Sequence, residues 1–130
     1  MPYAKTTRGR LRQVELWLKA NYPTEYPVVV KVCRFSGEDL DCVGFIQRDG
    51  RKLVIKLDSR EVRKLVRGRA VELLLHEYAH ALVYKKHMDG HPMEVHHDEH
   101  WGVAYAKLYN AYFDEDGDKD SDEYSTRPFA

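Results

Sequence analysis

The segment that most constrains this chain is the apolar run Arg69–Lys86, RAVELLLHEYAHALVYKK, which contains the pattern H-E-x-x-H. A helix rises about 1.5 Å per residue with 3.6 residues per turn, so His76 and His80 project from one face with Glu77 beside them. The opposite side is an apolar arc broad enough to be buried. That arc consists of Val71, Leu74, Leu75, Tyr78, Ala81 and Leu82.

Three ionisable side chains on a mostly buried helix need a partner, because burying polar groups without one is costly. His76 and His80 at this spacing can hold one Zn²⁺, and Glu77 can act as the general base. The alternatives are a charged patch on a surface helix and a metal-free helical scaffold. A surface helix would not carry so wide an apolar arc, so the pattern predicts a metal site with Glu77 as its catalytic residue.

Length and composition describe a soluble globular protein of one domain. The chain has 130 residues, of which 43% are apolar and 32% charged, as in ordinary globular domains. It has neither an apolar run long enough to span a membrane nor an apolar secretion signal, which predicts a cytoplasmic protein. Cys33 and Cys42 form no C-x-x-C pair and are expected to be small buried hydrophobes and not a disulfide.

Charge is distributed unevenly along the chain although the net charge is zero. Residues 1–70 contain 16 Lys and Arg against 8 Asp and Glu, whereas residues 114–130 contain 2 against 7. A basic N-terminal half predicts an anionic partner, most commonly DNA or RNA. The alternative is a solvated basic surface that the acidic tail partly neutralises. The oligomeric state cannot be read from the sequence.

Hydrophobic periodicity predicts an α+β domain over residues 1–113. A basic lead-in without secondary structure over residues 1–9 precedes an amphipathic helix. Three β-branched or alternating segments then predict a three-stranded sheet, with Asp49-Gly50 as a hairpin turn. Asp58 or Ser59 can cap the next helix, and Gly68 either breaks that helix from the H-E-x-x-H helix or only weakens one long helix. The expected elements are a helix at 10–21, strands at 28–35, 42–47 and 53–57, helices from 60 and at 69–86, and a last helix at 98–113.

The C-terminal residues 114–130 are acidic and lack apolar periodicity, which predicts a flexible tail. The last helix before this tail supplies the third ligand that a catalytic zinc needs. Extending its apolar stripe back by one turn from Trp101 reaches His97, with His96 as the alternative. The stripe consists of Trp101, Tyr105, Leu108 and Tyr112. His87 lies about 10.5 Å along the axis from His80 and cannot share its ion, and the pattern assigns no role to His91 or His100.

The segments HEYAHAL and HDEHW together resemble the SprT-like zinc metallopeptidase family, which includes the Spartan proteases that act on DNA–protein crosslinks. His76, Glu77 and His80 match the first motif of that family, and His97 with Trp101 matches its H-x-x-x-aromatic motif. The resemblance covers about residues 10–113 and extends to small phage-encoded members. It implies a zincin-like fold in which the C-terminal helix carries the third ligand. This chain lacks the C-terminal cysteine zinc ribbon of longer members, and Asp98 stands where the family has a small residue.

These observations predict a zinc-dependent metalloprotease that hydrolyses peptide bonds in protein substrates, including DNA-associated proteins. His76, His80 and His97 would bind zinc, and Glu77 would move the proton from water to the leaving amine. Tyr105 and Tyr78 are candidates for the oxyanion partner by residue type. The alternative function is a nucleic-acid-binding module with a structural zinc and no proteolysis.

Overall fold

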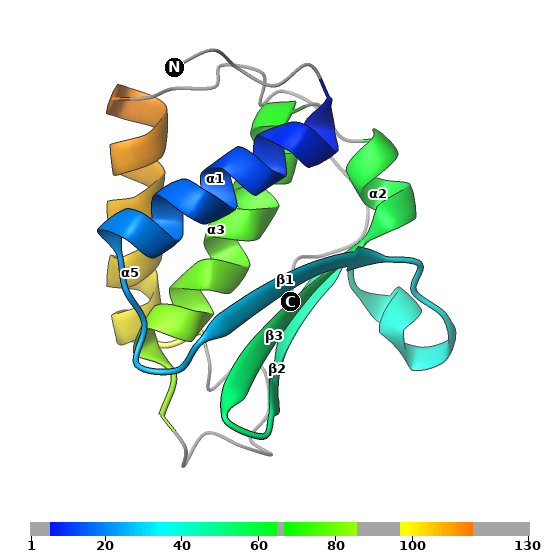
Figure 1. Ribbon diagram of the computed structural model, residues 1–130, viewed down its shortest axis with the longest axis horizontal. Helices are drawn as coiled ribbons and strands as arrows, with labels where there is room; N and C mark the ends of the chain where they lie inside the picture. Colours follow the sequence, from blue (N-terminus) through cyan, green and yellow to red (C-terminus); the bar gives the residue numbers. More distant parts are fainter. Residues whose placement is uncertain (1–5, 65–66, 86–96, 116–130) are drawn as a thin grey trace.

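The structure, a computed structural model, describes residues 6–64, 67–85 and 97–115. It has the predicted α+β order of an N-terminal helix, a three-stranded sheet and further helices (Figure 1). No helix within these residues is long and apolar enough to cross a membrane. The elements are α1 Thr7–Asn21, β1 Val28–Cys33, the 3₁₀ turn η1 Gly37–Asp41, β2 Gly44–Asp49, β3 Lys52–Asp58, α2 Ser59–Lys64, α3 Arg67–Val83, α5 Glu99–Asn110 and the π-helical segment η3 Ala111–Glu115.

The sheet is mixed, with β3 at its centre. β1 runs parallel to β3 and β2 runs antiparallel to it, in the order β1-β3-β2. The predicted hairpin between β2 and β3 is confirmed, since Asp49 pairs with Lys52 and Gly50 has a positive φ of 64°. Glycine reaches that backbone region without a steric penalty, which is why an Asp-Gly step favours this turn.

β1 is two residues shorter than the sequence predicted. Its last residue, Cys33, pairs with Asp58, where β3 also ends. The Phe35 amide donates to the Asp58 side chain at 3.5 Å, and the Arg60 guanidinium donates to the Phe35 carbonyl at 2.9 Å. These side-chain bonds occupy the polar backbone groups of Phe35, so the chain leaves the sheet before that residue.

α1 begins earlier than predicted, and the prediction of an unstructured lead-in over residues 1–9 was wrong from Thr6 onward. The Thr6 hydroxyl accepts a hydrogen bond from the Gly9 amide at 3.0 Å, which is the standard N-cap contact. Arg10 is buried against the core. Residues 1–5 lie outside the described part of the chain.

The helix after β3 begins as predicted, with Asp58 in the capping role. Its carboxylate accepts from the Arg60 amide at 3.2 Å, and α2 spans Ser59–Lys64. Gly68 lies inside α3, so it does not interrupt the helix that carries the H-E-x-x-H pattern. Residues 65 and 66, between the two helices, are outside the described part.

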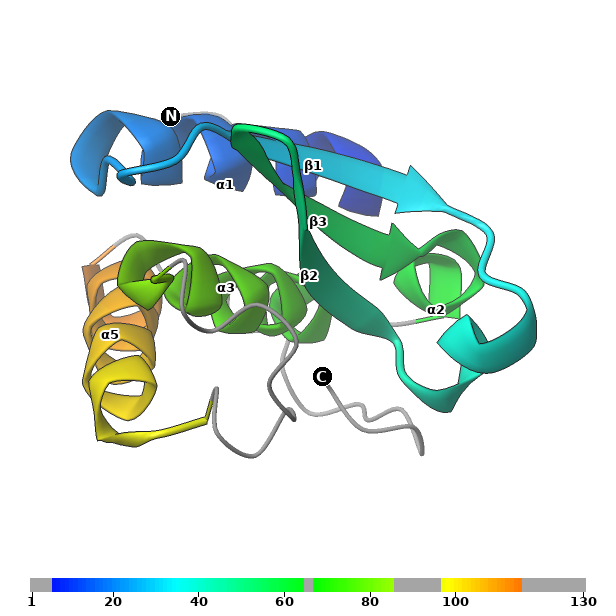
Figure 2. The same ribbon diagram turned by 90° about the horizontal axis from the view of Figure 1, so that it is seen from below.

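α3 is the central element of the core. It contacts α1, α5, β2 and β3 (Figure 2). Every residue from Ala70 to Ala81 is buried. The predicted apolar arc is therefore buried apart from its last member, Leu82, which is half-buried. Burial of such side chains contributes about 1.5–3 kcal/mol each, so the histidine-bearing helix is also the helix on which the fold depends most.

Candidate metal centre

The two histidines of the H-E-x-x-H pattern lie one turn apart on α3, as the sequence predicted. Their ring centroids are 5.3 Å apart, and both residues are more than nine-tenths buried. Because α3 is fixed by the core on its other sides, these two imidazoles are carried on a rigid support.

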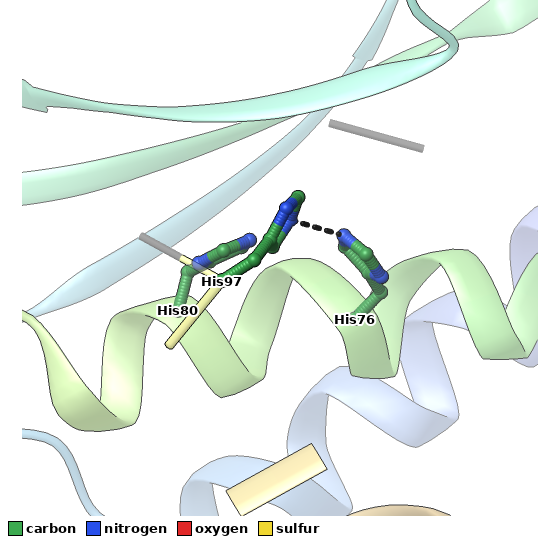
Figure 3. A group of neighbouring side chains, drawn as sticks. All are labelled: His76, His80 and His97. Atoms are coloured by element: carbon green, nitrogen blue, oxygen red, sulfur yellow. Dashed lines mark hydrogen bonds between the residues drawn. The ribbon is translucent and has the colours of Figure 1, made fainter. Parts of the chain in front are cut away.

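The structure brings His97 to the same place from the segment immediately before α5. Its Nε2 atom lies 3.3 Å from Nε2 of His76, and its ring centroid lies 4.8 Å from that of His80 (Figure 3). Taking one nitrogen from each ring, the three nitrogens lie within 4.8 Å of one another. The histidine that the apolar stripe reached, His97, is thus one of the three in this group, whereas the alternative, His96, lies outside the described residues.

Asp98 and Trp101 explain why His97 reaches α3. Asp98 is the N-cap of α5, and its carboxylate accepts from the Trp101 amide at 3.1 Å. The Trp101 indole N–H then donates to the His76 carbonyl at 3.2 Å. Through these two bonds the start of α5 is docked on α3, and the residue preceding the cap lies over the imidazoles.

The three imidazoles fit a transition-metal ion. A tetrahedral zinc with Zn–N distances of about 2.0–2.1 Å holds its nitrogens about 3.3–3.4 Å apart, which is the separation found between His76 and His97. The His80 nitrogen lies within 4.8 Å of the other two. Imidazole ligands suit zinc, copper, iron and nickel, so the donor set defines a class of ions.

Glu77, between the two α3 histidines in the sequence, has no exposed surface. Neither carboxylate oxygen has a hydrogen-bond partner among the described residues. Burial raises the pKa of this carboxyl well above its usual range. Glu77 directly follows His76 in the sequence, so its carboxyl is carried by the same helix as two of the three imidazoles.

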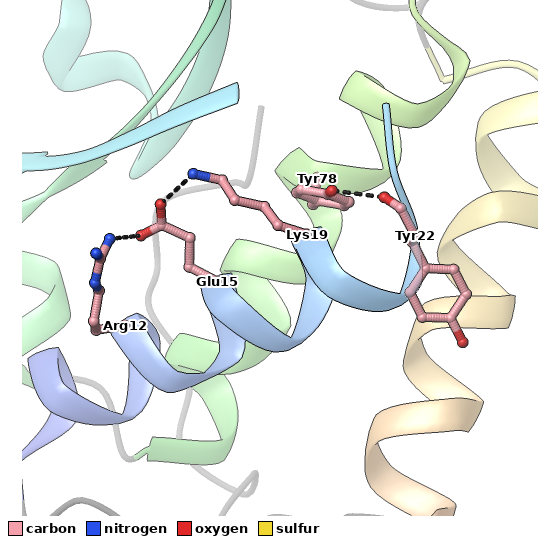
Figure 4. Close-up of polar contacts among 5 residues, drawn as sticks. All are labelled: Arg12, Glu15, Lys19, Tyr22 and Tyr78. Carbon is pink, nitrogen blue, oxygen red and sulfur yellow. Dashed lines mark hydrogen bonds and ion pairs between the residues drawn. The ribbon is translucent and has the colours of Figure 1, made fainter. Parts of the chain in front are cut away.

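The two tyrosines considered as oxyanion partners have different environments. The Tyr78 hydroxyl donates at 2.7 Å to the carbonyl of Tyr22, the C-cap residue of α1, and the side chain is fully buried (Figure 4). Burial, followed by the nearby Glu15 charge, raises the pKa of Tyr78 to about 12. Its hydroxyl is therefore committed to α1, and the structure removes Tyr78 as an oxyanion candidate.

Tyr105 lies beside the cluster, with its ring centroid 5.6 Å from that of His76. Burial, followed by the charge of Glu72, raises the pKa of Tyr105 to about 12, so the phenol stays protonated at neutral pH. Glu72 is itself paired with Arg69 at 2.5 Å, one turn before His76 on α3. Sequence patterns do not reveal this polar pair as part of the site, because its charges act on Tyr105 only once α3 and α5 are packed together.

The remaining histidines and cysteines are not part of this group within the described residues. His100 is exposed on α5, and His87, His91 and His96 fall outside the described part of the chain. Neither Cys33 nor Cys42 is in a disulfide, as expected, although both are half-buried and not fully buried.

The comparison with known proteins found no protein-family model, no curated protein and no solved structure that matches this chain.

Proposed function

We propose that this chain is a zinc-dependent metalloprotease of the SprT-like type, which hydrolyses peptide bonds in protein substrates. The observation that supports this most directly is the convergence of His76, His80 and His97 on one point, with ring nitrogens within 4.8 Å. Three protein ligands are the number that catalytic zinc sites use, because the fourth position is kept for water or substrate.

In this proposal each residue of the site has one role. Zinc, when bound, would supply Lewis-acid polarisation of the scissile carbonyl and a lowered pKa for water. The imidazoles of His76, His80 and His97 would bind it in their neutral form. Glu77 would accept the proton of the attacking water at its carboxylate and deliver it to the leaving amine nitrogen.

The order of the elements agrees with the SprT-like resemblance. His97 directly precedes the helix α5, and Trp101, the aromatic residue four positions later, packs on the α3 histidines. Asp98, the departure from the family pattern, acts as the helix cap. The substitution is thus compatible with a third ligand at His97.

The alternative function, a nucleic-acid-binding module with a structural zinc, has less support. Structural zinc sites are closed by four protein ligands and usually include cysteine. Among the described residues the metal-ligating group contains three histidines and no cysteine, and Cys33 and Cys42 lie elsewhere in the sheet region.

DNA is proposed as an additional partner of the protease. The N-terminal half exposes many cationic side chains that could contact phosphates. They are Arg8, Arg12, Lys19, Lys31, Arg34, Arg48, Arg51 and Arg63. Binding through such contacts should weaken steeply as salt concentration rises, which an anisotropy titration with a labelled oligonucleotide would measure.

The decisive experiment combines zinc stoichiometry with a cleavage assay. Wild-type protein should contain one zinc per chain and cleave casein or histone, with or without added single-stranded DNA. Glu77→Gln should retain the zinc and lose cleavage, because the amide cannot accept the proton. Glu99→Gln, on the exposed start of α5, is the matched control and should retain both. Full activity of Glu77→Gln would contradict the proposed mechanism.

A further inference from the structure

Trp101 contacts all three histidines of the candidate metal centre. Its ring centroid lies 4.8 Å from that of His76, 5.3 Å from that of His80 and 4.7 Å from that of His97. The indole is close to parallel with the His80 imidazole, at 23°, and inclined to the other two rings. One side chain therefore packs against every imidazole of the group.

The indole is itself held in place from three directions. Its N–H donates to the His76 carbonyl at 3.2 Å, and the Trp101 backbone amide donates to the Asp98 carboxylate at 3.1 Å. The Tyr105 ring is also stacked on the indole, with centroids 5.3 Å apart and planes inclined by only 13°. A ring fixed at its face, its N–H and its backbone cannot turn away without breaking one of these contacts.

We propose that Trp101 is the positioning residue of this centre, and that its indole holds the three imidazoles close to ligand geometry before an ion binds. Free imidazoles would populate several rotamers, and an ion would have to order all of them on binding. The indole removes most of that freedom, so metal affinity depends on a residue that contributes no ligand atom. Residues that orient metal-bound histidines typically change affinity by about 10- to 100-fold when they are replaced.

This inference rests on metal binding by the three histidines and is independent of peptide hydrolysis. Trp17 of α1 provides a matched control, because it is also half-buried and contacts Tyr22 and Tyr112. Replacing Trp17 removes the same side chain from the core without touching the contacts around His76. Comparing the two tryptophans separates a general loss of packing from a specific effect on the site.

The test measures Zn²⁺ affinity by competition with a chromogenic chelator, and the visible absorption of the Co²⁺-loaded protein as a readout of ligand geometry. Trp101→Leu should weaken Zn²⁺ binding by about 10- to 100-fold and change the Co²⁺ spectrum. Trp101→Phe keeps a ring but no N–H, so it should bind more tightly than the leucine variant and more weakly than wild type. Trp17→Leu should leave both readouts unchanged.

Wild-type affinity and an unaltered Co²⁺ spectrum in Trp101→Leu would overturn the positioning role while leaving the metal centre intact. If Trp101→Leu does not fold, the test is made with Trp101→Phe. A wild-type Zn²⁺ affinity and Co²⁺ spectrum in Trp101→Phe would then overturn the positioning role. Equal weakening by Trp101→Leu and Trp17→Leu would also overturn it, since the effect would then be one of stability. Failure of the wild type to bind Zn²⁺ at all would instead refute the proposed metal centre.

Discussion

Gly44 allows the edge strand β2 to lie close against α3, and its replacement by alanine should destabilise the fold. A Cβ atom at this position would lie 2.9 Å from Cδ1 of Leu73, 3.1 Å from Cδ2 of Leu57 and 3.3 Å from the Lys56 carbonyl oxygen. Both leucines have no exposed surface, so neither can move its side chain into solvent. The strand would have to shift away from the helix or the two leucines would have to leave their preferred rotamers.

The expected loss can be worked out from two opposing terms. Overpacking a core by one methyl group costs about 1–3 kcal/mol, while the lower entropy of the unfolded chain returns about 0.4–1 kcal/mol for a glycine-to-alanine change. The net loss therefore lies between about 0 and 2.6 kcal/mol and is centred near 1.3 kcal/mol, which corresponds to a melting temperature lower by about 3–8 °C in a domain of this size. Urea unfolding followed by circular dichroism would give the free energy directly.

Gly102 supplies the control for this experiment. It lies within α5, and a Cβ atom there would meet nothing within 4 Å. Gly102→Ala should stabilise the protein by about 0.5–1 kcal/mol, through better helix propensity and a less flexible unfolded chain. A Gly44→Ala variant that unfolds at or above the wild-type urea midpoint would refute the close-packing argument.

Three further variants test the helix cap at Asp98, the hydrogen bond of the buried Tyr78 and the three-histidine site. Asp98→Ala removes the acceptor of the Trp101 amide and should lower the free energy of urea unfolding by about 1 kcal/mol. Asp98→Asn keeps an acceptor and should retain most of that stability, so equal losses of stability in the two variants would rule out the capping role. Tyr78→Phe leaves the Tyr22 carbonyl without its donor and should lower the free energy of unfolding by about 1 kcal/mol, so unchanged thermal stability would contradict that bond's contribution. Zinc at 100 times its dissociation constant should stabilise the wild type by about 2.7 kcal/mol and should stabilise His97→Ala far less. If a chelator shifts the melting curves of the zinc-loaded wild type and of His97→Ala equally, that result would argue against the three-histidine site.

The features that the sequence predicted well depend on local periodicity. The spacing of His76 and His80 fixes their shared face on any helix, and the Asp-Gly step fixes the hairpin whatever surrounds it. The same reasoning located His97, because the stripe that begins at Trp101 continues back by one helical turn. The α+β order of the described elements followed from these local patterns.

The features that the sequence could not predict depend on contacts between distant segments. The parallel pairing of β1 with β3 joins segments that are far apart in the sequence, and strand patterns do not specify it. Tyr78 and Tyr105 were equivalent by residue type, and only the packed structure shows one bonded to α1 and the other beside His76. The start of α1 depended on a single hydroxyl, at Thr6, within a stretch whose basic composition resembled an unstructured segment.

The cluster joins two parts of the chain whose contact is otherwise made by side-chain packing and by the hydrogen bond from the Trp101 indole to the His76 carbonyl. His76 and His80 belong to the deeply buried helix α3, whereas His97 precedes α5, whose outer residues are exposed. An ion held by all three would tie the local opening of α5 to its own release. Amide hydrogen exchange along α5 would then slow as zinc is added, and the exchange rate of that helix would report the occupancy of the site.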